Sequence, residues 1–142
     1  MNYAELHARS AFSFLRGSSS PEHLAFTAAD LHLPALALCD RDGVSGAPRF
    51  YTAAQECGIR PIVGSELTME DGSVLPVLVQ SRIGYQNLCR LLSRAKLRSP
   101  KNESSIRWSE LSEFQEGLIC LTGDEEGPLQ KALVTGDFSR AD

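Results

Sequence analysis

The sequence lacks a hydrophobic run long enough to cross a membrane. Its longest purely apolar stretch, residues 33–39, is seven residues long and includes a proline, whereas a membrane-spanning helix needs about 20 residues. Residues 1–5 provide neither a basic leader nor an apolar core, so nothing in them predicts secretion. We therefore expect a cytoplasmic protein with no membrane partner.

Several common site signatures are also missing. The four cysteines are widely spaced and form no C-x-x-C pair, which argues against a zinc knuckle and a disulfide framework. No G-x-x-x-x-G-K-[ST] stretch occurs, so no phosphate-binding loop is predicted. The formal net charge is −4, so any contact with nucleic acid must come from a local basic patch.

What the chain does have is an ordinary globular composition. Hydrophobic residues make up 42% of it and charged residues 23%, which excludes the low-hydrophobicity signature of disorder. A chain of 142 residues can bury one core, so one domain is the starting assumption. Strand-like and helix-like stretches alternate, which is typical of parallel βαβ units. We expect an α/β fold.

The expected elements follow from apolar periodicity, caps and turn residues. Strands are expected at residues 3–8, 35–39, 67–69, 74–79 and 118–122, with another opening at 62–63, and helices at 21–31, 47–57, 84–97, 108–114 and 128–134. Asp71 and Gly72 predict a hairpin turn. Aromatic side chains among other apolar positions are expected in the core, namely Phe12, Phe14, Phe26, Phe50, Tyr51 and Tyr85.

Three ligand-type side chains recur at comparable places along the expected strands. His7 lies near the end of the first strand, Asp40 just after the second and Glu66 just after the third. The carboxyl ends of parallel strands share one face, so these side chains are expected to converge. Imidazole and carboxylates suit zinc or manganese. Taken singly, each has a simpler explanation as a strand histidine, a turn aspartate or a loop cap.

A local basic patch lies on the strongest predicted helix. Arg90, Arg94 and Arg98 are four residues apart, so they should form one row on its surface. The row could contact DNA phosphates or another part of a larger protein. A solvated helix face is the commoner explanation for such a pattern.

Several stretches, in order and at suitable spacing, resemble one known family. The segments ELHARS (residues 5–10), LALCDRDGVSG (36–46) and GSEL (64–67) look like the first three motifs of PHP domains fused to bacterial polymerases of the polymerase III alpha type. Residues 84–92 and 117–122 are similar to later stretches of that domain. The resemblance covers nearly the whole chain and is closest to the error-prone branch.

The resemblance implies a PHP-type fold, a distorted TIM-like β/α barrel with a mainly parallel sheet, of which residues 1–142 supply an incomplete amino-terminal portion. It implies a parent error-prone, DNA-directed DNA polymerase in damage-induced or translesion synthesis. Mg²⁺ would serve that enzyme in a palm region absent here, so no catalytic residue is expected in this segment. Expected partners are DNA, the rest of the polymerase chain and other replication or repair proteins.

The match to metal-binding members is incomplete. By resemblance, His7, Asp40 and Glu66 match family metal ligands, but Arg9 and Arg41 stand where further histidines belong. Arginine cannot ligate a metal, because its guanidinium stays charged and offers no lone pair. These departures argue against bound zinc or manganese, and no cofactor is predicted for the segment itself.

The substituted arginines suggest a replacement for the metal. Our hypothesis is that Arg9 and Arg41 form a salt-bridge cluster with Asp40, Glu66 and Glu5, which preserves the pocket and removes its hydrolytic chemistry. The alternative is that both arginines face solvent, where an ion pair contributes only about 0–1 kcal/mol. Either way, the segment is expected to be an inactive scaffold.

Two other functions remain open. One is a metal-dependent phosphoesterase or exonuclease-like PHP module, against which the two arginines count. The other is a free-standing module that binds DNA or protein through Arg90, Arg94 and Arg98. Salt-dependent binding to DNA that weakens when those arginines are replaced would favour the second.

Overall fold

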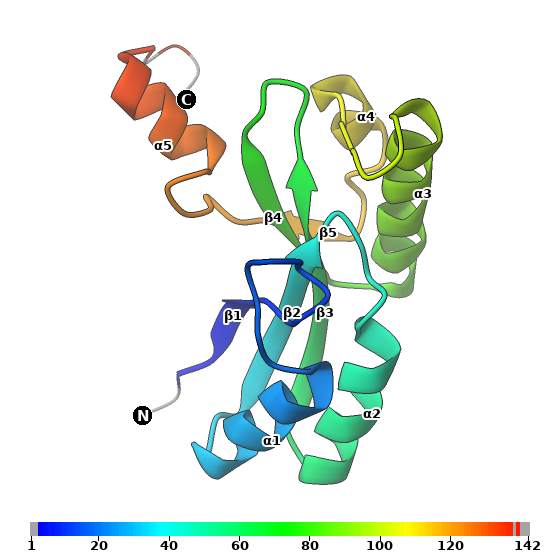
Figure 1. Cartoon of the computed structure of the whole chain (residues 1–142), viewed down its shortest axis with the longest axis vertical. Coiled ribbons are helices and arrows are strands. Elements are labelled where there is room, and N and C mark those ends of the chain that lie inside the picture. Colours follow the sequence, from blue (N-terminus) through cyan, green and yellow to red (C-terminus); the bar gives the residue numbers. More distant parts are fainter. Residues whose placement is uncertain (1–2, 138, 140–142) are drawn as a thin grey trace. The chain divides into compact units, whose positions relative to one another are not determined.

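The computed structural model describes residues 3–137 and 139 and has an α/β fold (Figure 1). Five strands in the described residues form one sheet in the order β1-β2-β3-β4-β5. The chain divides into two compact units, residues 1–65 and 66–142. The expected α/β fold class is confirmed. Among the described residues, no helix has both the length and the apolar character needed to cross a membrane.

The first unit alternates strands and helices as predicted. Its elements are β1 (Glu5–Ala8), α1 (Pro21–Asp30), β2 (Ala35–Arg41), α2 (Ala47–Cys57) and the first part of β3 (Arg60–Thr68). Strand β1 pairs in parallel with β2, and α1 packs against α2 (Figure 1). The core between these helices and β2 consists of buried alanines and larger apolar residues, namely Ala25, Ala28, Leu36, Leu38, Phe50, Ala53, Ala54 and Ile59.

Local capping sets the helix ends in this unit. The Ser20 hydroxyl accepts a hydrogen bond from the His23 backbone amide at 3.2 Å, and Pro21 begins α1 without an amide that would need a partner. Gly58 ends α2 in the left-handed region at φ 75°, which a glycine adopts without steric cost.

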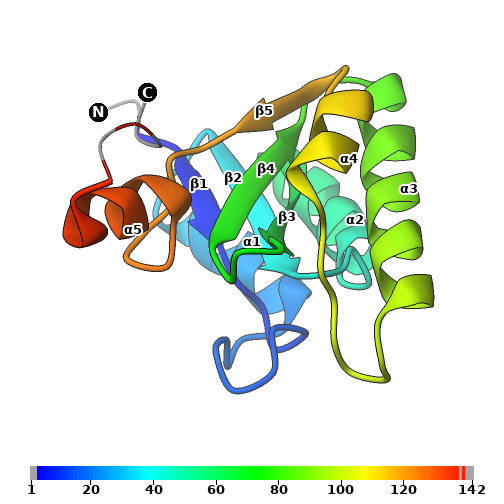
Figure 2. The same cartoon turned by 90° about the horizontal axis from the view of Figure 1, so that it is seen from above.

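The second unit contains the end of β3 and five further elements. These are β4 (Val74–Val79), α3 (Arg82–Arg98), α4 (Trp108–Glu113), β5 (Leu118–Cys120) and α5 (Pro128–Thr135). Strands β4 and β5 run antiparallel, with Leu78 opposite Ile119. The expectation of a mainly parallel sheet is confirmed, with an antiparallel pair at the edge where β5 turns back along β4. Helices α3 and α4 lie side by side in both views (Figures 1 and 2).

Two predicted strand ends are wrong in a way that matters for the site. Asp40 lies inside β2, which runs to Arg41, and Glu66 lies inside β3, which runs to Thr68. Their exposed fractions are 2% and 0%. A carboxylate in a sequence usually indicates the end of a buried strand, but here the burial of Asp40 is compensated by hydrogen-bond donors.

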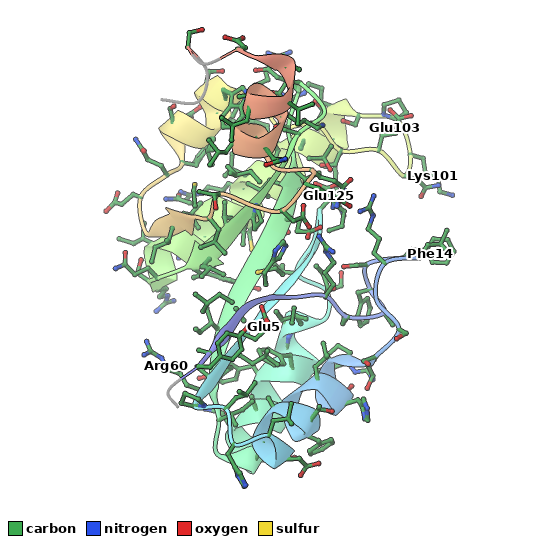
Figure 3. The ribbon with its side chains drawn as sticks, turned by 90° about the vertical axis from the view of Figure 1, so that its left-hand side faces the viewer. Glu5, Phe14, Arg60, Lys101, Glu103 and Glu125 are labelled. Carbon is green, nitrogen blue, oxygen red and sulfur yellow. The ribbon has the colours of Figure 1, made fainter. Side chains whose placement is uncertain are left out.

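The prediction that the aromatic residues lie in the core holds only for Phe50, which is fully buried. Phe14 is 83% exposed at the tip of the β1–α1 loop and points away from the ribbon (Figure 3). The others are substantially exposed as well, namely Phe12, Phe26, Tyr51 and Tyr85. Their apolar neighbours in the sequence gave no signal of which side of each element faces solvent.

Candidate functional site

Asp40 is held in a buried hydrogen-bond network within the first unit. Its Oδ1 accepts hydrogen bonds from the Ser10 backbone amide and the Ser13 hydroxyl, both at 2.7 Å. Its Oδ2 accepts a third from the Ser10 hydroxyl, also at 2.7 Å. A carboxylate offers about four acceptor sites, so most of its capacity is used by the β1–α1 loop. This environment favours a structural role for Asp40.

Glu5 is engaged by its own strand. Its Oε2 accepts from the Tyr3 hydroxyl at 2.7 Å and its Oε1 accepts from the His7 backbone amide at 2.8 Å. The hydrogen bond from Tyr3 to Glu5 raises the pKa of the tyrosine above its ordinary value. His7 itself is half-buried on β1, where the sequence placed it. The predicted pairing of Glu5 with Arg9 and Arg41 stays a prediction.

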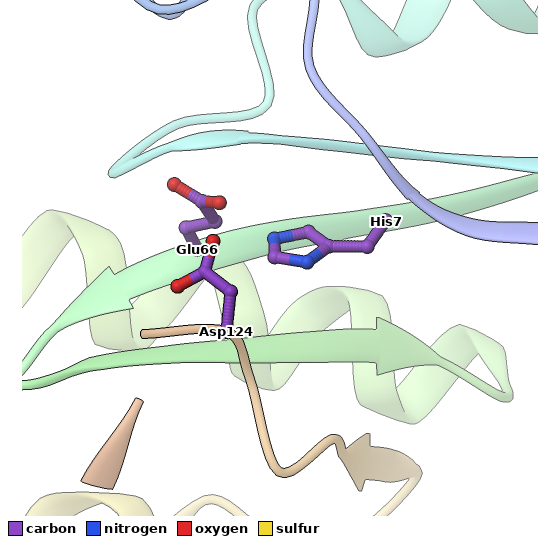
Figure 4. Close-up of side chains that lie close together, drawn as sticks. All are labelled: His7, Glu66 and Asp124. Atoms are coloured by element: carbon purple, nitrogen blue, oxygen red, sulfur yellow. The ribbon is translucent and has the colours of Figure 1, made fainter. Parts of the chain in front are cut away.

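The second unit brings two carboxylates together. One oxygen of Glu66, on β3, lies within 4.8 Å of one oxygen of Asp124, in the turn after β5 (Figure 4). Glu66 is fully buried, whereas Asp124 is exposed. Two carboxylate oxygens at this separation are donors of the kind that a divalent cation accepts.

Sequence reasoning missed Asp124. It follows the strand-like segment of residues 118–122 and a glycine, a place where aspartate is common as a turn residue. In the structure its Oδ1 does accept from the Glu126 backbone amide at 3.0 Å, as such a turn requires. Only the fold shows that the same side chain lies beside Glu66.

The arginine row on α3 divides into two groups. Arg98 donates to both carboxylate oxygens of Glu110, at 2.6 and 2.9 Å, and so fastens α3 to α4. Arg94 donates to Glu113 at 2.8 Å but keeps 45% of its side chain exposed. Arg90, one turn earlier, is exposed. The predicted row exists, and its last member joins α3 to α4; a contact of the row with nucleic acid or a partner stays a prediction.

The carboxyl group of Glu110 has a lowered pKa. The hydrogen bond from Arg98 holds its pKa at about 2, well below the ordinary value of 4.5, with a further contribution from the Arg107 backbone amide at 3.0 Å. Because this amide is at the amino-terminal cap of α4, one carboxylate satisfies both the helix end and the neighbouring helix. Arg98 and Glu110 thus form a structural ion pair between α3 and α4.

The order of these elements and motifs agrees with one family model. The PHP domain model matches residues 5–142. The chain belongs to the PHP domain family. This confirms the resemblance found in the sequence and gives the partial β/α architecture its family context.

Relatives of this PHP chain include two kinds of polymerase. The chain is 38% identical to an error-prone DNA polymerase of Symbiobacterium thermophilum, across 100% of the chain and 15% of the polymerase. It is 35% identical to a DNA polymerase III subunit alpha of Buchnera aphidicola, across 96% of the chain and 12% of that subunit. The chain thus spans only a small part of the length of each polymerase.

A solved structure supports the fold. An amidohydrolase of Chromobacterium violaceum superposes with a TM-score of 0.56 at 25% identity, covering 66% of this chain and 33% of that protein. The likeness supports the fold of this PHP chain, and its function has to be argued from its own residues.

Proposed function

We propose that this chain is the amino-terminal PHP segment of an error-prone, DNA-directed DNA polymerase that acts in damage-induced or translesion synthesis in the cytoplasm. The observation that carries the proposal is the 38% identity to an error-prone polymerase along the whole chain. The rest of the polymerase chain and DNA would be its partners. Mg²⁺ would serve nucleotide addition in regions of the polymerase that this segment does not include.

The proposed role of the segment itself is scaffolding. In support, Asp40 is occupied by hydrogen bonds from the loop between β1 and α1. Arg98 is likewise occupied by the bond to α4. Asp40 and Arg98 therefore each hold neighbouring elements together.

The reading frame beyond the codon for Asp142 tests this proposal. In the native transcript, a polymerase segment requires an open frame that continues through the rest of the barrel into a palm region. An immediate stop codon would contradict the proposal and leave a free-standing module as the function.

A second proposal concerns the metal. We propose that one divalent cation, zinc or manganese, binds to Glu66 and Asp124 of the second unit, two of the side chains drawn in Figure 4. The predicted role of His7 as a metal ligand stays a prediction. The donor set fits, because carboxylate oxygens can coordinate either ion. Asp124 replaces Asp40 in this set because the carboxylate of Asp40 already accepts three hydrogen bonds.

The proposed site is reduced relative to metal-binding PHP domains. Arg9 and Arg41 stand where the resemblance expects histidines, and arginine cannot ligate a metal, so the proposed site has fewer ligands than those domains. A bound ion of this kind supplies Lewis-acid chemistry and a hydroxide near neutral pH. The competing hypothesis is the salt-bridge cluster of Arg9 and Arg41 with nearby carboxylates, in which no ion binds.

A further inference from the structure

The α3–α4 face carries a groove that neither the PHP fold nor the metal proposal uses. It is a shallow, open groove with a volume of about 570 Å³. Its lining combines cationic, apolar and aromatic side chains from α3 and the residue after α4, namely Cys89, Arg90, Ser93, Arg94, Leu97 and Phe114. All of them lie in the second unit.

Arg94 is held as a rigid, planar cation in this groove. Its guanidinium carbon lies 4.6 Å from the centre of the Phe114 ring, and its Nη1 donates to Glu113 at 2.8 Å. The ring and the carboxylate therefore fix the guanidinium from two directions while 45% of the side chain stays exposed. A guanidinium fixed in this way can stack on a nucleobase and donate to a phosphate.

Arg90 provides the second cation. It lies one helical turn before Arg94, so the two side chains share a face of α3. Its Nη1 donates to the amide oxygen of Asn87 at 3.3 Å, and in the described part of the chain it forms no ion pair with an acid. Its charge therefore remains available to an anion, whereas Glu113 offsets part of the charge of Arg94.

Leu97 supplies an apolar surface beside these cations. It is 89% exposed although it belongs to a well-formed helix. Exposing a large leucine to water is unfavourable, whereas covering it with the face of a base is favourable. Leu97 lies next to the arginine that stacks on Phe114. The groove thus places hydrogen-bond donors for backbone phosphates beside apolar and aromatic surfaces on which any base can stack.

We propose that the α3–α4 groove binds single-stranded DNA, with backbone phosphates at Arg90 and Arg94 and bases against the Arg94–Phe114 stack and Leu97. Charge complementarity and the planar cation distinguish this ligand from an apolar peptide, and one strand rather than a duplex exposes its base faces. The inference rests on the proposed function, since a polymerase segment acts near template strands.

Fluorescence anisotropy with a labelled oligothymidine and the 142-residue chain tests the proposal. Arg90→Gln and Arg94→Gln should each weaken binding at least about fivefold near 50 mM salt and lower the salt slope by about 0.7. Phe114→Leu should weaken binding without changing that slope. Arg60→Gln removes the same charge from an exposed position in the first unit (Figure 3) and should change neither quantity beyond its error.

Circular dichroism and thermal unfolding would establish that each variant is folded before binding is compared. Equal losses in Arg60→Gln and the groove variants would overturn the proposal, because binding would then reflect overall charge alone. Absence of measurable binding by the folded wild-type chain, or a preference for an acidic peptide over the oligothymidine, would also overturn it. The assay contains no polymerase step, so its outcome is separate from that of the reading-frame test.

Discussion

Ser13 donates its hydroxyl hydrogen to Oδ1 of Asp40 at 2.7 Å across 27 positions of sequence. The same hydroxyl oxygen accepts from the Arg41 backbone amide at 3.1 Å. Ser13 therefore joins the loop after β1 to the end of β2 through one atom. The aspartate of the second PHP motif acts here as an anchor for that loop.

The Asp40→Asn substitution should destabilise the first unit. The amide group that it introduces would turn N–H donors toward the Ser10 and Ser13 donors and lose charge-assisted hydrogen bonds, at a cost of about 1.5–3 kcal/mol. Urea unfolding followed by circular dichroism measures this cost. Asp30→Asn, at an exposed position ending α1, is the matched control and should change stability by less than about 0.5 kcal/mol. Equal stability of the two variants would show that Asp40 is not an anchor.

Stability should fall in acid partly through Glu110. Because Arg98 lowers the pKa of Glu110 to about 2 in the folded protein, the stabilisation is complete above its ordinary pKa of 4.5 and is lost as the pH falls toward 2. Glu110→Gln should therefore be less stable than wild type at pH 7, and the difference should shrink below pH 4.5. Urea unfolding across this range measures it, with exposed Glu103→Gln as the control (Figure 3). A difference that is constant with pH would contradict the ion-pair assignment.

Gly84 should tolerate no side chain. A Cβ at this position would lie 1.9 Å from the carbonyl oxygen of Gly117, a backbone atom that cannot move aside without shifting the start of β5. Gly84→Ala should lower the free energy of unfolding by about 1–3 kcal/mol. The exposed Gln86→Ala change on the same helix should be near neutral or stabilising. Thermal unfolding compares the two, and an unchanged melting temperature in Gly84→Ala would refute this packing.

Manganese binding should depend on Glu66. In calorimetric titration with Mn²⁺, Glu66→Gln should abolish the binding shown by the wild-type chain, because it removes one charged ligand from the proposed set. Glu125→Gln removes an equal charge next to Asp124 and should leave binding in place (Figure 3). If the folded wild-type chain binds no Mn²⁺ or Zn²⁺, the single-ion proposal is wrong and the salt-bridge hypothesis is favoured.

Elements with local signals were predictable from the sequence. Helix α2 begins and ends at the predicted residues, 47 and 57, because a proline near its start and a left-handed glycine after its end are local features. The same reasoning placed α5 within one residue of its end. Hydrophobic periodicity likewise found α3, whose buried positions follow the expected spacing.

Features that depend on distant partners were not predictable. The sequence gives no sign that Ser10 and Ser13 supply the donors for Asp40, so a buried carboxylate inside β2 looked like a turn residue. The pairing of Arg98 with Glu110 joins helices separated by an irregular loop, and the row of arginines suggested a common role instead. Each of these contacts joins residues far apart in the chain, which local sequence patterns do not report.

The most direct test of the central claim is primer extension by a chimera. The aligned segment of the Symbiobacterium thermophilum error-prone polymerase would be replaced by this 142-residue chain, with a segment deletion as the comparison. If the chain is the PHP scaffold of such a polymerase, the chimera should extend a primer as the parent does, whereas the deletion should not. A folded chimera that binds primer-template but fails to extend it would contradict the account.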